Sequence, residues 1–110
     1  MSHATKFAPQ LRPTLSELDI RLELSGSRGR YVVPVEGGEA ELTLSIASPT
    51  LRIADHTSVP DNVRGTGVGR ALVQRLVDDA RAEGFKVVPL CPYVNAERRR
   101  HPEWADVFST

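Results

Sequence analysis

Hydrophobic and polar residues alternate along four stretches in the first half of the chain. These stretches are residues 20–24, 30–35, 40–47 and 51–59. A period of two is typical of a β-strand with one buried face. In the fourth stretch the alternation directs Leu51 and Ile53 toward the core, and Pro34 in the second predicts a sheet edge or a bulge. Segments rich in glycine, serine and proline separate the stretches, so the pattern predicts four strands in an antiparallel meander.

The periodicity changes to that of a helix after residue 70. The apolar residues that recur at helical spacing are Leu72, Val73, Leu76, Val77 and Ala80. Gly84 is a typical C-terminal stop for this helix. Residues 85–90 are nearly all apolar, as in a strand that is covered on both faces. A strand, a turn, a helix and a strand form a βαβ unit, so residues 51–59 and 85–90 should be parallel neighbours.

The two ends of the chain differ in character. Residues 1–14 are polar and contain two prolines, and we expect a flexible tail there, followed by a single domain over residues 15–110. Near the other end, residues 93–100 can form a short helix that the following His-Pro pair ends. The apolar and aromatic side chains beyond this pair should pack back onto the core.

Composition narrows the functional classes. The 110 residues include 14 Lys and Arg and 14 Asp and Glu, so the net charge is zero. A neutral chain offers no general electrostatic attraction for nucleic acid or an acidic membrane surface, and we expect neither as a partner. No apolar run reaches the roughly 18 residues of a membrane span. The single cysteine excludes an internal disulfide and favours the reducing cytoplasm. We expect no metal site, and a monomer or a weak homodimer.

Three glycines occupy five positions of the stretch VRGTGVGRALV, residues 63–73, directly before the helix. Glycine costs about 0.5–1 kcal/mol relative to alanine inside regular structure. The Walker pattern fails because Arg70 stands where lysine is required, and the same arginine breaks the dinucleotide pattern GxGxxG. Bare backbone at a helix N-terminus still suits a phosphate, with Arg64 and Arg70 adding positive charge. The alternative is a tight turn with both arginines in solvent.

The stretch Arg64-Gly65-Thr66-Gly67-Val68-Gly69 resembles the Gln/Arg-x-x-Gly-x-Gly/Ala motif of the GCN5-related N-acetyltransferase (GNAT) superfamily. That motif wraps the pyrophosphate of acetyl-coenzyme A. Four ordered segments, HTSV, RGTGVGRALV, VVPLCPYV and HPEW, are also similar to a subfamily of very small single-domain members, over about residues 30–108. The resemblance implies a minimal GNAT fold of the α+β (α/β) class. In it, an antiparallel meander precedes a βαβ unit, whose parallel strands four and five splay apart, and a short C-terminal helix.

The resemblance also implies a cofactor site for acetyl-coenzyme A. The loop residues that would hold the pyrophosphate are Arg64, Gly65, Thr66, Gly67, Val68, Gly69 and Arg70. Pantetheine would lie in the gap between strands four and five and bond to the main chain of strand four, including Thr57 and Val59. Asn95 resembles an asparagine that often touches the cofactor at the start of the following helix.

The catalytic residues are less clearly marked. His56 has a suitable intrinsic pKa for a base, although a second reading is a capping or supporting histidine. Small relatives usually carry an acid after His-Thr, where this chain has Ser58. Cys91 lies beside the expected thioester, as a transient acetyl acceptor or as an inert buried thiol. The resemblance makes Tyr93 a candidate to protonate the leaving thiolate, with His101 as a rival; the alternative is that both residues only pack or cap.

Three functions follow from these features. The first is an acetyl-coenzyme-A-dependent N-acetyltransferase. Its acceptor side should be open, because the chain lacks an obvious helical pair before its second strand, and this suits a protein or peptide amine. The second is a non-catalytic module that binds acetyl-coenzyme A and regulates a partner, as the replacement of the acid by Ser58 suggests. The third is an unrelated interaction protein that uses the basic run Arg98 to Arg100.

Overall fold

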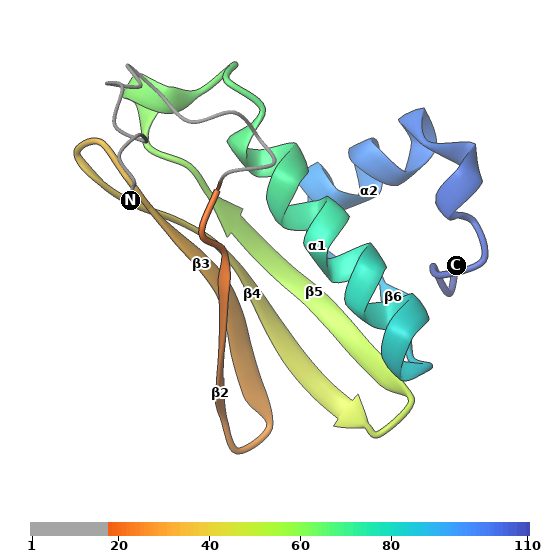
Figure 1. Ribbon diagram of the computed structural model, residues 1–110. Coiled ribbons are helices and arrows are strands. Elements are labelled where there is room, and N and C mark those ends of the chain that lie inside the picture. Colours follow the sequence, from red (N-terminus) through yellow and green to blue (C-terminus); the bar gives the residue numbers. More distant parts are fainter. Residues whose placement is uncertain (1–17) are drawn as a thin grey trace, which may run out of the picture.

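The computed structural model describes residues 18–110, which form a five-stranded sheet in the order β2-β3-β4-β5-β6 (Figure 1). The strands are β2 (Arg21–Ser25), β3 (Arg28–Val35), β4 (Gly38–Ser48), β5 (Leu51–Ser58) and β6 (Lys86–Val88). The first four pair antiparallel and β6 pairs parallel to β5, which confirms the predicted meander and βαβ unit. The predicted tail at residues 1–14 lies outside the described residues.

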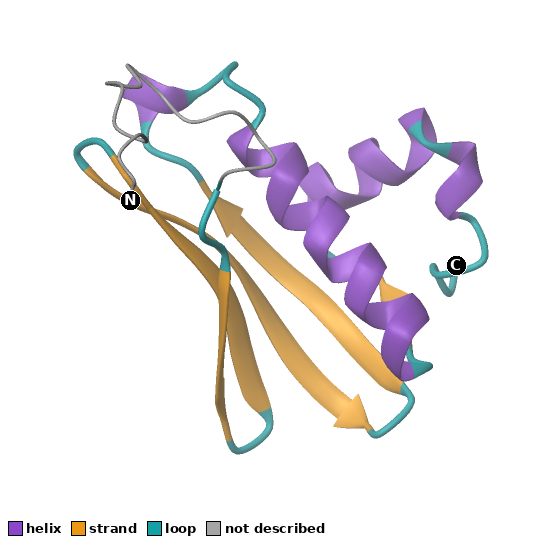
Figure 2. Cartoon of the chain, in the orientation of Figure 1, coloured by secondary structure: helices purple, strands orange, loops and turns teal. Residues whose placement is uncertain are grey.

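Two helices and two short 3₁₀ turns complete the described part (Figure 2). They are η2 (Asp61–Val63), α1 (Val68–Glu83), α2 (Pro92–Arg100) and η3 (Pro102–Trp104). Gly84 ends α1 in a left-handed conformation with a φ of 81°, as its sequence predicts. Within residues 18–110, no helix is long and apolar enough to cross a membrane.

The core lies between α1 and one face of the sheet (Figure 1). The predicted apolar stripe of α1 is buried, with Leu72, Val73, Leu76 and Val77 each 0 % exposed. Leu44 of β4 lies opposite this stripe, also 0 % exposed. Each fully buried side chain of this size contributes roughly 1.5–3 kcal/mol, so α1 is held mainly by its packing on the sheet.

The prediction for the inner face of β5 was wrong. Ala54, not Leu51 or Ile53, belongs to the buried cluster under α1. The side chain of Arg52 is on the same face as Ala54, and its guanidinium lies 4.1 Å from the centre of the Phe85 ring. An arginine can cover apolar surface with its stem and stack on an aromatic ring, so alternation alone assigned the strand faces incorrectly.

Pro34 lies at a local edge of the sheet, although β3 is an interior strand. β2 pairs with β3 only as far as Val32, so Pro34 has β4 alone as a neighbour. A proline without an N–H is tolerated there because no β2 carbonyl awaits its donor. The edge that Pro34 predicts therefore exists because β2 does not extend alongside Pro34.

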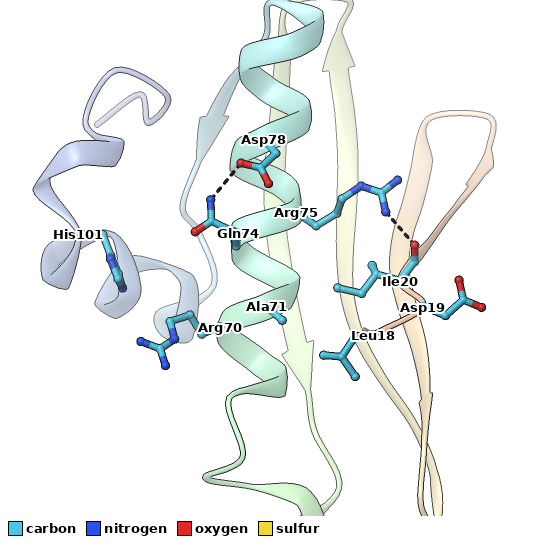
Figure 3. A pocket seen from close by; sticks show the side chains of 9 residues that line it. All are labelled: Leu18, Asp19, Ile20, Arg70, Ala71, Gln74, Arg75, Asp78 and His101. Carbon is cyan, nitrogen blue, oxygen red and sulfur yellow. Dashed lines mark hydrogen bonds between the residues drawn. The ribbon is translucent and has the colours of Figure 1, made fainter. Parts of the chain in front are cut away.

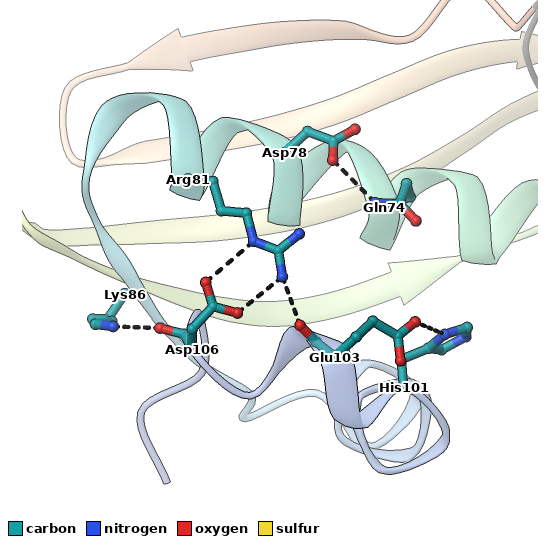
Figure 4. Close-up of polar contacts among 7 residues, drawn as sticks. All are labelled: Gln74, Asp78, Arg81, Lys86, His101, Glu103 and Asp106. Carbon is teal, nitrogen blue, oxygen red and sulfur yellow. Dashed lines mark hydrogen bonds and ion pairs between the residues drawn. The ribbon is translucent and has the colours of Figure 1, made fainter.

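The C-terminal segment is fastened to the last turn of α1 and to β6 (Figure 4). Arg81 donates to both carboxylate oxygens of Asp106, at 3.2 and 2.9 Å, and to the backbone carbonyl of Glu103 at 2.7 Å. Lys86 donates to the backbone carbonyl of Asp106. The expected return of the C-terminal apolar side chains is confirmed, since Trp104 is 2 % exposed.

The Arg81–Asp106 contact predicts an acid-dependent contribution to stability. Arg81 holds the pKa of Asp106 below its usual value, so the contribution is complete above the ordinary aspartate pKa of about 3.9 and is lost as the pH falls through the lowered value. We expect D106N to unfold at lower urea concentration than wild type at pH 7, and the difference to shrink in acid. Asp78 accepts from the neutral amide of Gln74, so D78N is the matched control. A D106N difference that is constant with pH would contradict the assignment.

Candidate functional site

The site lies where β6 leaves β5. The two strands pair over only three positions, Leu51↔Lys86, Arg52↔Val87 and Ile53↔Val88. Pro89 then has no N–H to donate. The N–H of Cys91 donates back to the carbonyl of Ala54 at 2.8 Å, and α2 begins at the next residue. Within the described residues, the β6 side of β5 therefore has no strand partner over residues 55–58, and the predicted parting of strands four and five is confirmed.

The glycine loop joins β5 to α1 through η2 and two residues in left-handed conformations. Gly65 has a φ of 82°, and Gly67, the N-cap of α1, has a φ of 93°. Non-glycine residues rarely adopt these values. Thr66 donates from its hydroxyl to the carbonyl of Val63 at 2.6 Å, which fixes the turn.

The loop leaves backbone donors free at the N-terminus of α1. The first bond of the helix runs from Ala71 to the carbonyl of Gly67, at 3.0 Å. No acceptor among the described residues receives the N–H of Val68, Gly69 or Arg70. Unpaired N–H groups and the positive end of the helix dipole suit an anion such as a pyrophosphate. Arg64 is tied to Val59 through a bond from its Nε to the carbonyl, at 3.3 Å.

Position 69 favours glycine for a second reason, which the sequence did not reveal. A Cβ at this position would lie 2.7 Å from the hydroxyl oxygen and 2.9 Å from Cζ of Tyr93. The Tyr93 ring, at the start of α2, therefore packs directly on the backbone of α1. The glycine at position 69 permits this close approach of the two helices as well as access to the helix N-terminus.

A pocket of about 560 Å³ opens beside this contact. Its lining comes from the end of β5, the glycine loop, the first turn of α1 and α2. The residues are Thr57, Val59, Val63, Arg64, Gly65, Gly67, Val68, Gly69, Arg70, Tyr93 and Glu97. The structure thus brings together Thr57, Val59, Tyr93 and most of the predicted pyrophosphate loop.

Cys91 lies beside Thr57, one of the residues that line the pocket. Its sulfur is 3.4 Å from the hydroxyl oxygen of Thr57, and the residue is 2 % exposed. The thiol is therefore next to the β5 backbone where the resemblance puts the thioester, but the protein covers it. This burial favours the packed thiol over the transient acetyl acceptor.

The structure does not bring His56 to the pocket. His56 pairs with Thr43 across the sheet, one position from Thr57, so its side chain is on the face opposite α1 and is exposed. A bulge at Asp55 sets this arrangement, and the Asp55 carboxylate accepts from Ser45 at 2.6 Å. The predicted role of His56 as a base remains a prediction, and it would require an acceptor on that outer face.

Asn95 and the basic run also lie apart from the pocket lining. The side-chain oxygen of Asn95 accepts from Nε of Arg98 at 2.8 Å, within α2. Arg100 donates to Glu97 at 2.9 Å. Two of the three arginines in the run thus make contacts within α2. The predicted cofactor contact of Asn95 remains a prediction.

Sequence reasoning missed two carboxylates near the site. Glu97 is 6 % exposed and lines the pocket with Tyr93. Its spacing of four residues from Tyr93 on a helix was a usable signal. Glu41 of β4 lies directly opposite Ser58 in the sheet register, where Arg30 donates to it at 2.6 Å. No sequence signal could reveal Glu41, because the pairing joins separate strands.

The surroundings of Tyr93 change the pKa of its hydroxyl group. Burial raises the pKa of Tyr93, and the negative charge of Glu97 raises it further, while Arg70 and Arg100 act in the opposite direction. At neutral pH the residue is therefore a protonated phenol that can donate a hydrogen bond or a proton.

A second pocket, of about 640 Å³, lies along the outer side of α1 (Figure 3). Its polar side chains are largely engaged with the protein: Gln74 donates to Asp78 at 3.0 Å, and Arg75 donates to the carbonyl of Ile20 at 2.7 Å. It shares Arg70 with the first pocket but not the glycine loop, so we place the candidate site in the first pocket.

The contact between Gly69 and Tyr93 predicts that the effect of G69A on the free energy of unfolding depends on whether Tyr93 is present. G69A should lower the free energy of unfolding by about 1–3 kcal/mol, because the new methyl group overlaps the Tyr93 ring. In a Y93A background the same change should be neutral or stabilise by up to about 1 kcal/mol, since alanine is the better helix former. Urea denaturation of the four proteins measures both values. An equal effect of G69A in the two backgrounds would show that the contact is unimportant.

Comparison with known proteins identifies the family of the chain. A family model described as GCN5-related N-acetyl-transferase matches residues 30–107, which include the glycine loop, the end of β5 and all of α2. A search of the curated proteins finds no match. The match spans well over half of the chain and includes every residue that lines the pocket. The chain therefore belongs to the GCN5-related N-acetyltransferase family.

Proposed function

We propose that this protein transfers the acetyl group of acetyl-coenzyme A to an amine. The observation that carries the proposal is the union of two features in one pocket. The lining includes Val68, Gly69 and Arg70, whose N–H groups are free, and Thr57, which lies on the unpaired edge of β5. The first suits a pyrophosphate and the second suits the amide groups of pantetheine.

The residues present fit this cofactor. When bound, acetyl-coenzyme A supplies an activated thioester. Arg64 and Arg70 add positive charge beside the loop, and Thr57 and Val59 offer backbone groups along the pantetheine. Tyr93 is held as a phenol, so it has the proton that a departing thiolate needs. The four ordered motifs further favour the branch of small single-domain members.

We propose a protein or peptide amine as the acceptor. β5 has no strand partner over residues 55–58 on its β6 side within the described residues, and Leu90 beside this opening is 66 % exposed. An open, partly apolar approach suits a side chain or terminus that a larger molecule presents. The acceptor's ammonium group must first lose a proton, because only the neutral amine can attack the thioester. His56 and Glu41, on the outer face of the sheet, are the candidates for that base.

A non-catalytic acetyl-coenzyme A module is the second candidate function. Ser58 stands where small relatives carry an acid, and the carboxylate of Asp55, three residues earlier on β5, is engaged with Ser45. These features leave β5 without a free carboxylate at the site. The two functions share the cofactor pocket and differ only in turnover, so the release of free thiol in the presence of peptide amines distinguishes them.

A charge reversal in the loop tests the cofactor site. Asparagine and aspartate both tolerate the left-handed conformation of Gly67, so G67N and G67D differ mainly in one negative charge. We expect acetyl-coenzyme A to bind wild type in a calorimetric titration, and G67D to bind at least about tenfold more weakly than G67N, because of repulsion from the pyrophosphate. Thermal melts confirm that both variants fold. Equal affinities would contradict the placement of the pyrophosphate, and no binding to wild type would contradict both functions.

The burial of Cys91 predicts direct transfer to the amine. C91A should keep kcat within about threefold of wild type, because a buried thiol only packs against Thr57. Mass spectrometry of protein quenched during turnover should find no acetyl group on Cys91. A loss of about a hundredfold or more in C91A, together with an acetylated cysteine in wild type, would establish the covalent route instead.

A further inference from the structure

Glu97 is the one charged residue that is buried among the residues the structure describes. It sits on α2 and lines the proposed cofactor pocket. One carboxylate oxygen accepts from Arg100 at 2.9 Å. The other, Oε1, is fully shielded and has no hydrogen-bond partner within residues 18–110. Burying a carboxylate oxygen without a partner opposes folding, and an apolar residue would pack here without that cost. The charge therefore points to a role beyond packing.

The groups that face Glu97 follow one another from the pocket to the surface. Tyr93 precedes it by four residues on the same side of α2, at the pocket. Oε1 of Glu97 is 3.6 Å from Nε2 of His101, which follows Glu97 by four residues. The other ring nitrogen of His101 is 3.0 Å from the exposed carboxylate of Glu103 (Figure 4). The His101 ring is fixed by stacking on Trp104, with centroids 4.0 Å apart.

The remaining charges around this series come from α1 and α2. Arg70 of α1 and Arg100 of α2 both favour the ionised form of Tyr93, and Glu97 opposes it. From β5, the pocket lining contributes only the uncharged Thr57 and no titratable group. Burial and the negative charge of Glu97 together keep Tyr93 protonated, and Glu97 also lies between Tyr93 and an imidazole.

We propose that Glu97 is a positioning residue that links Tyr93 to His101 and returns a proton to Tyr93 after each turnover. This inference rests on the proposed acetyl transfer. As the carbon–sulfur bond of the thioester breaks, its electron pair goes to sulfur, and the Tyr93 hydroxyl gives its proton to that sulfur. A proton then passes from His101 through the Glu97 carboxylate to the Tyr93 oxygen. His101 is recharged from solvent beside Glu103, and solvent receives the proton that the amine loses.

Charge repulsion favours the return of the proton to Tyr93. A tyrosinate at Tyr93 would place a second negative charge beside the buried Glu97 carboxylate, which is unfavourable. Tyr93 therefore regains its proton readily. An imidazole both gives and takes up protons readily, and the exposed Glu103 carboxylate lies 3.0 Å from the outer ring nitrogen of His101, on the solvent side.

The substitution E97Q tests the proposal in the full chain. Glutamine keeps the shape and an acceptor for Arg100 but removes the charge and the proton-carrying oxygen. We expect kcat for acetylation of a peptide amine to fall by about tenfold or more, with KM for acetyl-coenzyme A within about twofold. R99A is the matched control, because Arg99 lies exposed on the same helix, and it should leave kcat unchanged.

A titration of the free protein gives a readout that is independent of activity. The chain has two tyrosines. Tyr31 is 0 % exposed and its pKa is raised strongly by burial and by its bond to Asp79, so Tyr93 ionises first. In E97Q the tyrosinate absorbance of Tyr93 should appear at lower pH by about half a unit or more. Y93F should abolish this first transition.

The double variant separates a shared pathway from independent effects. Y93F/E97Q should be no slower than Y93F alone, because the two residues act in one proton path. H101F keeps the stacking on Trp104 and removes both ring nitrogens, so it should slow kcat as E97Q does, and it carries the test if E97Q fails to fold. A wild-type enzyme that turns over while E97Q and H101F match its kcat would overturn the relay alone. A wild type that binds acetyl-coenzyme A but acetylates no amine would overturn the proposed transfer and the relay with it.

Discussion

The early departure of β6 from β5 is the constraint on which the site depends. Parallel strands are held by evenly spaced bonds, and here that ladder ends after three residue pairs. Pro89 cannot donate, and the N–H of Leu90 turns back to the carbonyl of Val88 at 3.0 Å. One further bond, from Cys91 to Ala54, holds the departing chain close enough for α2 to start beside β5. A longer β6 would close the gap and leave no unpaired edge for a ligand.

Helix α2 then completes the pocket because it starts at this fixed point. Pro92 at its first position suits a helix N-terminus, where an N–H is not needed. The next residue, Tyr93, reaches the backbone of α1 at Gly69, and Val94 is 0 % exposed in the core. The orientation of α2 is therefore set by one buried side chain and one ring against a glycine. The spacing of four then brings Glu97 and His101 to the same side as Tyr93.

Local patterns predicted most of the fold but not the faces of β5. The helical repeat of α1, its stop at Gly84 and the alternation of the first strands are properties of neighbouring residues, so the sequence displays them. The face of Arg52 depends on Phe85, a residue that the fold brings to it, and the bulge at Asp55 depends on the register with β4. The same distinction separates the site residues. The glycine loop was predictable because its conformations are local, whereas Glu41 became a candidate only through its partner across the sheet.

The small size of the described domain makes several residues serve two purposes. Gly69 permits the contact with Tyr93 and leaves the helix N-terminus open, and Thr57 lines the pocket while its hydroxyl contacts the Cys91 sulfur. Residues such as Gly69 and Thr57 therefore belong both to the candidate site and to the packing of the fold, unlike site residues on surface loops, which can vary more freely. A substitution at such a residue changes stability and the site together, so activity losses there reveal little unless folding is measured beside them. Glu97 differs in this respect: its unpartnered oxygen opposes folding, so removing its charge should separate the chemistry of the site from the stability of the fold.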